Sequence, residues 1–204
     1  MKIVALLGSP RLNGNSALLA GCFLETAKHL GAETQTFALN ALNYRGCQAC
    51  MSCKKNSELC ILRDDLSEVL QAVREADVIV LASPVYFGDV TGQMKLFIDR
   101  TYCYLVPDFH TNPQRSRLLP GKTFVFVQTQ GLADETVFAD VYPRYSEMMR
   151  YVGLEESHLL RACGVSLRNE VLSREDIVKQ AEDLAVQIMI KNIAQGEAAP
   201  AEEA

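Results

Sequence analysis

The stretch MKIVALLGSPRLNGNSALL, residues 1–19, decides the fold class of this 204-residue chain. Lys2–Leu7 is an apolar run of strand length that stops at Gly8. The polar loop Ser9–Ser16 follows, and a helical pattern begins at Ala17. A strand, a loop of small polar residues and a helix N-terminus together form an arrangement in which proteins bind phosphate.

This first loop carries several groups that can donate hydrogen bonds to a phosphate. Gly8 and Gly14 leave backbone N–H groups accessible, Ser9 and Ser16 supply hydroxyls, and Arg11 supplies a fork-shaped cation. The chain contains neither the G-x-G-x-x-G dinucleotide motif nor a Walker A motif. The loop therefore predicts a binding site for the terminal phosphate of a ligand. The alternative is an ordinary strand-to-helix connection whose polar residues only cap the helix.

The composition excludes several classes of protein. A hydrophobic content of 49% and a charged content of 22% are typical of a globular chain, and the net charge of −5 disfavours a nucleic-acid partner. No apolar run reaches the length of a membrane span, and the first residues lack the layout of a signal peptide. We therefore expect a cytoplasmic protein that binds neither nucleic acid nor membrane.

Strands and helices alternate along the whole chain. Strands are predicted at 2–7, 33–39, 77–82, 123–128 and 157–163. Helices are predicted at 17–30, after the Asp64-Asp65 pair, at 92–104, at 137–152 with a kink or break at Pro143, and after Ser173. This alternation predicts an α/β fold with a doubly wound parallel sheet and helices on both faces. One domain is expected over 1–194, and an acidic disordered tail over 195–204.

Three polar loops follow predicted strands: Ser9–Ser16, Ser83–Thr91 and Thr129–Gly131. Ligands of doubly wound sheets lie beyond the carboxyl ends of the strands, so the loops are expected to meet at one cleft. In the second loop, Pro84–Gly88 (PVYFG) places two aromatic residues beside a glycine, where a planar ligand could lie against the backbone. The alternative is that both aromatic rings pack under the following helix.

These loops carry a family resemblance. GSPRLNGNS at 8–16, SPVYFGDVTGQMKLFIDR at 83–100 and TQG at 129–131 resemble the flavodoxin-like NADPH-dependent FMN reductase family, over roughly residues 1–165. The resemblance implies a five-stranded sheet in the order 2-1-3-4-5, an FMN cofactor, NAD(P)H as a co-substrate and a homodimer or homotetramer. It implies no catalytic side chain, because the chemistry belongs to the flavin.

The same resemblance implies which residues bind FMN. The phosphate would be bound by Ser9, Arg11, Asn13, Gly14, Asn15 and Ser16. The isoalloxazine ring would lie along Pro84, Val85, Tyr86, Phe87 and Gly88, and Thr129, Gln130 and Gly131 would close the site.

Four of the seven cysteines form a compact motif, Cys47-x2-Cys50-x2-Cys53-x6-Cys60, in the cysteine-rich insertion 45–62. Such spacing lets four thiolates surround one [4Fe–4S] cluster. Zinc binding is one alternative, although structural zinc sites more often use two separated cysteine pairs. The other alternative is four thiols without a ligand. A cytosolic setting disfavours disulfides. The motif resembles that of iron–sulfur flavoproteins, a branch of the same family.

The sequence thus predicts an FMN-dependent oxidoreductase of the iron–sulfur flavoprotein type. It would pass electrons between a ferredoxin-like carrier or NAD(P)H and a small-molecule acceptor, through FMN and a [4Fe–4S] cluster. One alternative is an NAD(P)H-dependent FMN or quinone reductase without a cluster, and another is a flavodoxin-like electron carrier. Cys22 and Cys103 are interpreted as packing residues, and Asp99-Arg100 as an ion-pairing or helix-end feature.

Overall fold

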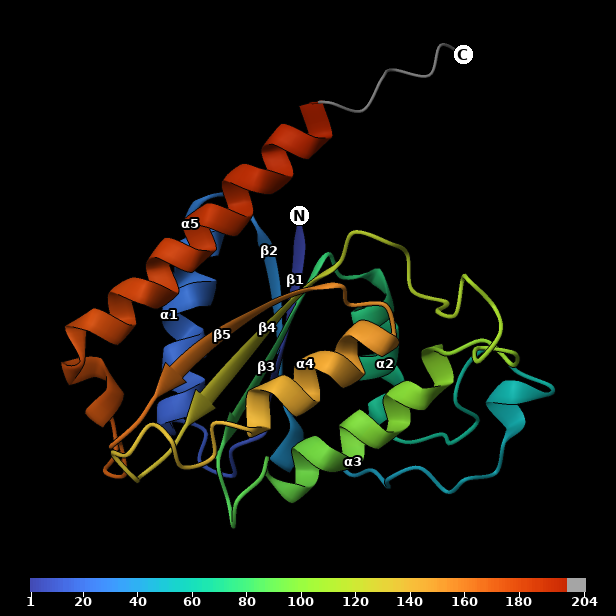
Figure 1. Ribbon diagram of the computed structural model, residues 1–204, viewed down its shortest axis with the longest axis horizontal. Helices are drawn as coiled ribbons and strands as arrows, with labels where there is room; N and C mark the ends of the chain where they lie inside the picture. The colour runs from blue at the N-terminus through green and yellow to red at the C-terminus, as the bar shows by residue number, and fades with distance from the viewer. Residues whose placement is uncertain (198–204) are drawn as a thin grey trace.

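The fold is a five-stranded parallel sheet covered by helices on both faces (Figure 1). The computed structural model describes residues 1–197, and the side chains of residues 1–192. The strand order is β2-β1-β3-β4-β5, so the predicted flavodoxin-like topology is confirmed. The strands are β1 (Lys2–Leu7), β2 (Glu33–Ala38), β3 (Val78–Pro84), β4 (Thr123–Thr129) and β5 (Glu156–Ala162).

Five α-helices in the described residues flank the sheet. They are α1 (Asn15–His29), α2 (Leu66–Glu75), α3 (Gly92–Arg100), α4 (Val141–Tyr151) and α5 (Glu175–Glu197). Short 3-10 turns lie at Leu39–Ala41, Ser52–Lys54, Thr101–Tyr104 and Glu170–Ser173. Helices α1 and α5 cover one face of the sheet, and α2, α3 and α4 cover the other (Figure 1). Within residues 1–197 no helix is long and apolar enough to cross a membrane.

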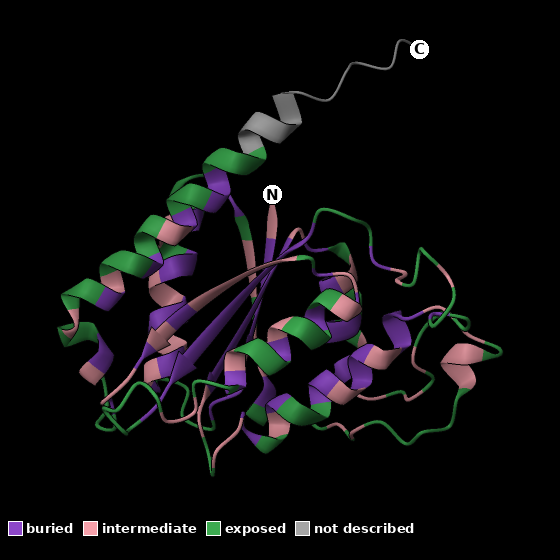
Figure 2. Ribbon diagram, viewed as in Figure 1, coloured by how far each residue is buried: buried purple, intermediate pink, exposed green. Residues whose placement is uncertain are grey.

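Alternate residues of β1 supply two separate hydrophobic cores. Ile3 and Ala5 pack with α1 and α5, whereas Val4 and Leu6 pack with α2, α3 and α4. Because both faces of the strand are buried, the sequence shows a continuous apolar run rather than an alternating pattern. The buried colouring of β1, β3 and β4 in Figure 2 reflects this double burial.

Each predicted strand is present with its ends within two residues, but two predicted helices differ. The helix predicted at 92–104 ends at Arg100 and continues as a 3-10 turn. The helix predicted at 137–152 begins only at Val141, and the kink expected at Pro143 was wrong. Pro143 lies in the first turn of α4, where an N–H group has no partner within the helix and its loss costs little.

Helix α2 begins directly after Asp65, and helix α5 runs into the predicted tail. Asp65 precedes α2 but makes no side-chain cap, because its carboxylate accepts the N–H of Asn43 instead. Helix α5 extends through Glu197, so it includes the first three residues of the tail predicted at 195–204. The rest of that prediction, residues 198–204, lies outside the described residues.

Candidate functional site

The loops after β1, β3 and β4 are joined by hydrogen bonds at the carboxyl edge of the sheet. The Gly8 N–H donates to the Ala82 carbonyl at 2.8 Å, and the Val85 N–H donates to the Thr129 carbonyl at 2.8 Å. The Thr91 hydroxyl donates to the Gly8 carbonyl at 2.7 Å and also caps α3. The three loops therefore meet at one place, as the topology predicts. The sequence interpretation overlooked Thr91, although a threonine directly before a helix is a typical N-cap.

Two glycines of the first loop leave no room for a side chain. A Cβ atom on Gly8 would lie 2.9 Å from the Thr91 hydroxyl oxygen. On Gly14 it would lie 2.6 Å from Ser9 Oγ and 3.1 Å from the Arg11 carbonyl oxygen. Contacts below 3.0 Å, which each glycine would make, are too short for real Cβ atoms, so the close path of the loop depends on both glycines.

The N-terminus of α1 offers unused donors to an anion. The N-cap is Gly14, which has no side chain to cap the helix. The first backbone hydrogen bond of the helix runs from the Leu18 N–H to the Gly14 carbonyl. The backbone N–H groups of residues 15–17 are thus available in the described structure. Ser16 is only 1% exposed, and its hydroxyl has no hydrogen-bond partner among the described residues. Such an orphaned donor beside a helix N-terminus suits a phosphate.

The remaining residues of this loop are placed differently from one another. Ser9 is buried and its hydroxyl accepts the Arg11 N–H at 3.1 Å, which tightens the loop. Arg11 and Asn13 are exposed. Both groups of the Asn15 amide are occupied, because Nδ2 donates to the Leu167 carbonyl and Oδ1 accepts the Val171 N–H. The Asn15 side chain is therefore bonded within the protein, and its backbone N–H is unpaired among the described residues.

The loop after β3 forms a tight two-residue turn. Tyr86 and Asp89 exchange backbone hydrogen bonds of 2.8 and 3.2 Å, and Phe87 and Gly88 both have positive φ angles, 51° and 89°. The Phe87 side chain is fully exposed and Tyr86 is half exposed. The alternative that both rings pack under the following helix is therefore wrong. Within the described residues, the N–H groups of Phe87 and Gly88 remain unused.

The loop after β4 contributes mainly backbone. Gln130 is buried, and its Nε2 donates to the carbonyls of Leu132, Asp134 and Val137 at 3.1–3.2 Å. Its side chain therefore holds the following loop in place. Thr129 is buried at the end of β4, and Gly131 is exposed beside Ser166.

The cysteine-rich insertion packs along α3. The Tyr44 hydroxyl donates to the Gln93 carbonyl at 2.7 Å, and Gly46 lies so close to Leu96 that a Cβ would be 2.7 Å from its Cδ2. At the other end, the Lys54 ammonium donates to the carbonyls of Tyr102 and Leu105, in and directly after the 3-10 turn that follows α3. Apart from one 3-10 turn, residues 43–65 form neither helix nor strand.

The four motif cysteines line one small cavity, of about 20 Å³, together with Arg100 and Cys103. All seven cysteines, which lie within the described residues, are free thiols. Across residues 1–197, however, no three His, Cys, Asp or Glu side chains are arranged closely enough to hold a metal ion. The donor set suits a cluster, whereas the cavity has room for about one water molecule. A larger group would therefore need the surrounding loop to move outward.

Electrostatic contacts hold this cavity together. Arg100 is fully buried and forms an ion pair with Asp64, with Nη1 2.9 Å from Oδ2. Burial lowers the pKa of Arg100, but the Asp64 ion pair and the nearby Cys60 sulfur raise it more. Hydrogen bonds from Ser52 lower the pKa of Cys50, and burial raises that of Cys103 to about 11. Cys50 is therefore the thiol nearer to ionisation, and Cys103 is the more inert.

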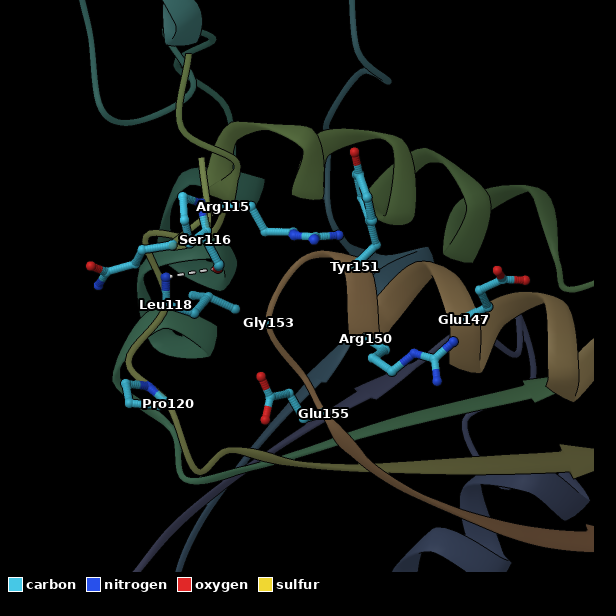
Figure 3. Close-up of a pocket in the computed structure, with 11 residues that line it drawn as sticks. Arg115, Ser116, Leu118, Pro120, Glu147, Arg150, Tyr151, Gly153 and Glu155 are labelled. Carbon is cyan, nitrogen blue, oxygen red and sulfur yellow. Dashed lines mark hydrogen bonds between the residues drawn. The ribbon is translucent and has the colours of Figure 1, made fainter. Parts of the chain in front are cut away.

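A separate hollow of about 740 Å³ lies at the opposite edge of the sheet, near the amino ends of β4 and β5 (Figure 3). Its charged groups are Arg115, Glu147, Arg150 and Glu155, so their charges compensate one another. The Arg115 guanidinium lies 5.0 Å from the centre of the Tyr151 ring. None of the predicted site residues lines this hollow.

The fold and the three-loop site define a flavodoxin-like protein. The family model described as NADPH-dependent FMN reductase matches residues 1–142, well over half of the chain. The protein therefore belongs to the NADPH-dependent FMN reductase family, a family of FMN-dependent oxidoreductases.

Curated relatives carry the name iron–sulfur flavoprotein. One from Archaeoglobus fulgidus is 39% identical over 104 residues, 51% of this chain and 47% of its own length. Another, iron–sulfur flavoprotein MJ1083 from Methanocaldococcus jannaschii, is 40% identical over 101 residues, 50% of this chain and 52% of its own length. The chain thus spans about half the length of the curated relatives it matches.

Solved structures share the fold. An FMN-dependent NADH-azoreductase from Bacillus anthracis in complex with FMN has a TM-score of 0.71 at 16% identity, covering 92% of this chain and 99% of its own. An NAD(P)H:quinone oxidoreductase from Methanothermobacter marburgensis has a TM-score of 0.71 at 18% identity, covering 91% and 94%. At such identities these likenesses show the fold alone.

Proposed function

We propose that this protein is an FMN-dependent oxidoreductase of the iron–sulfur flavoprotein type, which passes electrons from NAD(P)H or a ferredoxin-like carrier to a small-molecule acceptor. The observation that carries the proposal is the orphaned Ser16 hydroxyl beside the uncapped N-terminus of α1. Bound FMN would supply the conversion between two-electron and one-electron transfer.

The residues of the first loop would bind the FMN phosphate. The N–H groups of residues 15–17, the Ser16 hydroxyl and the exposed Arg11 guanidinium together provide short donors and one cation. Ser9 and Gly14 would shape the loop, because the Ser9 hydroxyl is bonded to the Arg11 N–H and Gly14 leaves space for it. Asn13 is exposed beside them.

The turn after β3 would bind the isoalloxazine ring. The N–H groups of Phe87 and Gly88 are unused, and donors of this kind stabilise negative charge that develops on a bound ring. Pro84 and Val85 would support the ring from the end of β3, while Thr129 and Gly131 would close the site mainly through backbone. The exposed Tyr86 and Phe87 side chains would exclude water once a ligand is bound.

Cys47, Cys50, Cys53 and Cys60 would hold a [4Fe–4S] cluster, which would supply one-electron transfer. The proposal is supported by the cavity that these four thiols line together and by the names of the relatives, iron–sulfur flavoproteins. Homodimer or homotetramer formation is a further part of the proposal, inherited from the family resemblance.

The test is an absorption spectrum of protein purified without oxygen, with FMN, iron and sulfide measured on the same sample. We expect flavin bands over broad iron–sulfur absorption, and about four iron atoms per chain. Cys60→Ser should lower the iron content, and the matched control Cys22→Ser should not, because Cys22 lies on α1 away from the cavity. A protein that binds no FMN contradicts the proposal.

A second candidate function is an NAD(P)H-dependent FMN or quinone reductase without a cluster. It is favoured by the cysteine geometry, since among residues 1–197 no metal-binding set is formed. Flavin bands without iron, together with rapid bleaching of the flavin by NADPH or NADH, would select this candidate. Flavin bands without iron and no reaction with either nicotinamide would select a flavodoxin-like electron carrier.

A further inference from the structure

Asp89 links the flavin-ring turn to helix α4. Its Oδ1 accepts the Tyr145 hydroxyl at 2.7 Å and the Val90 N–H at 2.7 Å, and its Oδ2 accepts Arg144 Nη1 at 3.2 Å. Asp89 also forms both backbone hydrogen bonds that close the turn with Tyr86. Its carboxylate is therefore bonded on both oxygens to groups outside the turn.

The helix side of this link is rigid. Tyr145 is 2% exposed, and its ring stacks on Phe126 of β4 with centroids 5.9 Å apart and planes at 18°. Since β4 is a central strand of the sheet, the Tyr145 hydroxyl is fixed relative to the sheet. A hydroxyl held in this way can hold the Asp89 carboxylate in one position.

The turn itself needs such support. Phe87 has a φ angle of 51°, a left-handed conformation that residues other than glycine seldom adopt. The neighbouring Gly88 is also left-handed. Without an external anchor, this pair would also adopt other turn conformations, in which its two N–H groups point elsewhere.

We infer that Tyr145 and Asp89 are positioning residues that hold the N–H groups of Phe87 and Gly88 toward the bound flavin and so set its reduction potential. This inference rests on the proposed function, because it requires FMN at the loop after β3. Neither residue touches the reacting atoms in this scheme. Tyr145 acts on Asp89, and Asp89 acts on the turn.

The test measures the two-electron potential of bound FMN in Tyr145→Phe, with Tyr142→Phe as the matched control. Tyr142 lies on the same helix, and its hydroxyl pairs with Ser157 at 3.0 Å, so the control also loses one hydrogen bond of α4. We expect Tyr145→Phe to lower the affinity for reduced relative to oxidised FMN about fivefold, which shifts the potential by about −20 mV. Tyr142→Phe should leave the potential unchanged.

Two Asp89 variants refine the test. Asp89→Asn keeps an oxygen that accepts from Tyr145 and Val90, so it should retain a near wild-type potential. Asp89→Ala should shift the potential at least as far as Tyr145→Phe, and the double variant should shift it no further than Asp89→Ala alone. Equal potentials in Tyr145→Phe, Tyr142→Phe and wild type would overturn the inference. Failure of the wild-type protein to bind FMN would instead overturn the proposed function.

Discussion

Replacing Ser16 by alanine should have opposite effects on stability and on FMN binding. In the described structure the buried hydroxyl has no partner, so the protein without ligand gains nothing from it. Removing an unsatisfied buried hydroxyl relieves a desolvation cost of ~1 kcal/mol or more, and alanine is the better helix former by up to ~0.5 kcal/mol. We therefore expect the free energy of unfolding of the apoprotein to rise by about 1 kcal/mol.

Binding of FMN should weaken in the same variant. A hydrogen bond to a charged group contributes about 1.5–3 kcal/mol, and each 1.4 kcal/mol is a factor of about ten in Kd. The Kd for FMN should therefore rise about ten- to hundredfold in Ser16→Ala. Riboflavin, which lacks the phosphate, should bind wild type and variant equally.

Urea unfolding of the apoprotein and fluorescence titration with both flavins measure these effects. Ser173→Ala is the control for a general loss of stability, because Ser173 lies in a 3-10 turn and its hydroxyl bonds to the Glu170 carbonyl. The assignment of the phosphate site would be refuted by an unchanged Kd for FMN. Equal losses of affinity for FMN and riboflavin would refute it as well, because the effect would then not depend on the phosphate.

Three further substitutions test the same structure. Gly14→Ala should weaken FMN binding at least tenfold by calorimetry, because its Cβ would lie 2.6 Å from Ser9 Oγ. Phe87→Gly should raise the unfolding free energy of the apoprotein in urea by ~1 kcal/mol, because it removes left-handed strain. Asp64→Asn should lower the free energy of unfolding by about 3 kcal/mol, because the buried Arg100 loses its charged partner. This value is the lower end of the loss expected when a buried ion pair is broken. Burial raises the pKa of Asp64, but the hydrogen bonds from Arg100 and from backbone N–H groups, together with the Arg100 charge, outweigh it and lower the pKa below its usual value. The stabilisation by Asp64 is therefore present above pH ~4 and is lost as the pH falls below that value. Urea titrations of wild type and Asp64→Asn should therefore converge in acid.

The parts of the fold that depend on local pattern were predictable from the sequence. Apolar runs of strand length followed by polar loops predicted the five strands. The family resemblance predicted their order in the sheet. The ion pairing expected for Asp99-Arg100 is present, with Lys95 and Asp64 as the two partners. Local sequence also located the three loops that meet at the carboxyl edge of the sheet, because parallel strands bring such loops together.

The parts that depend on distant partners were not predictable. The sequence does not reveal that the Asn15 side chain bonds to Val171, which lies 156 residues away. Nor does it reveal that the amide of Gln130 holds the loop that follows β4. The Tyr145–Asp89 contact spans 56 residues and leaves no periodic signal in the sequence. A polar residue in a motif can serve either a ligand or a neighbouring segment, and only the packed structure distinguishes the two.

Helix α3 joins the two candidate sites into one arrangement. Its N-cap, Thr91, bonds to the Gly8 carbonyl where the three loops meet, and its last residue, Arg100, lines the cysteine cavity. The helix has nine residues and is therefore about 13 Å long, at 1.5 Å per residue. Gly46 packs against Leu96 in the middle of this helix, so the cysteine segment is held along it. Because a helix of this kind keeps its length, α3 sets the separation of the two candidate sites. Outward movement of the cysteine loop would therefore change the cavity without moving the three loops at the carboxyl edge of the sheet.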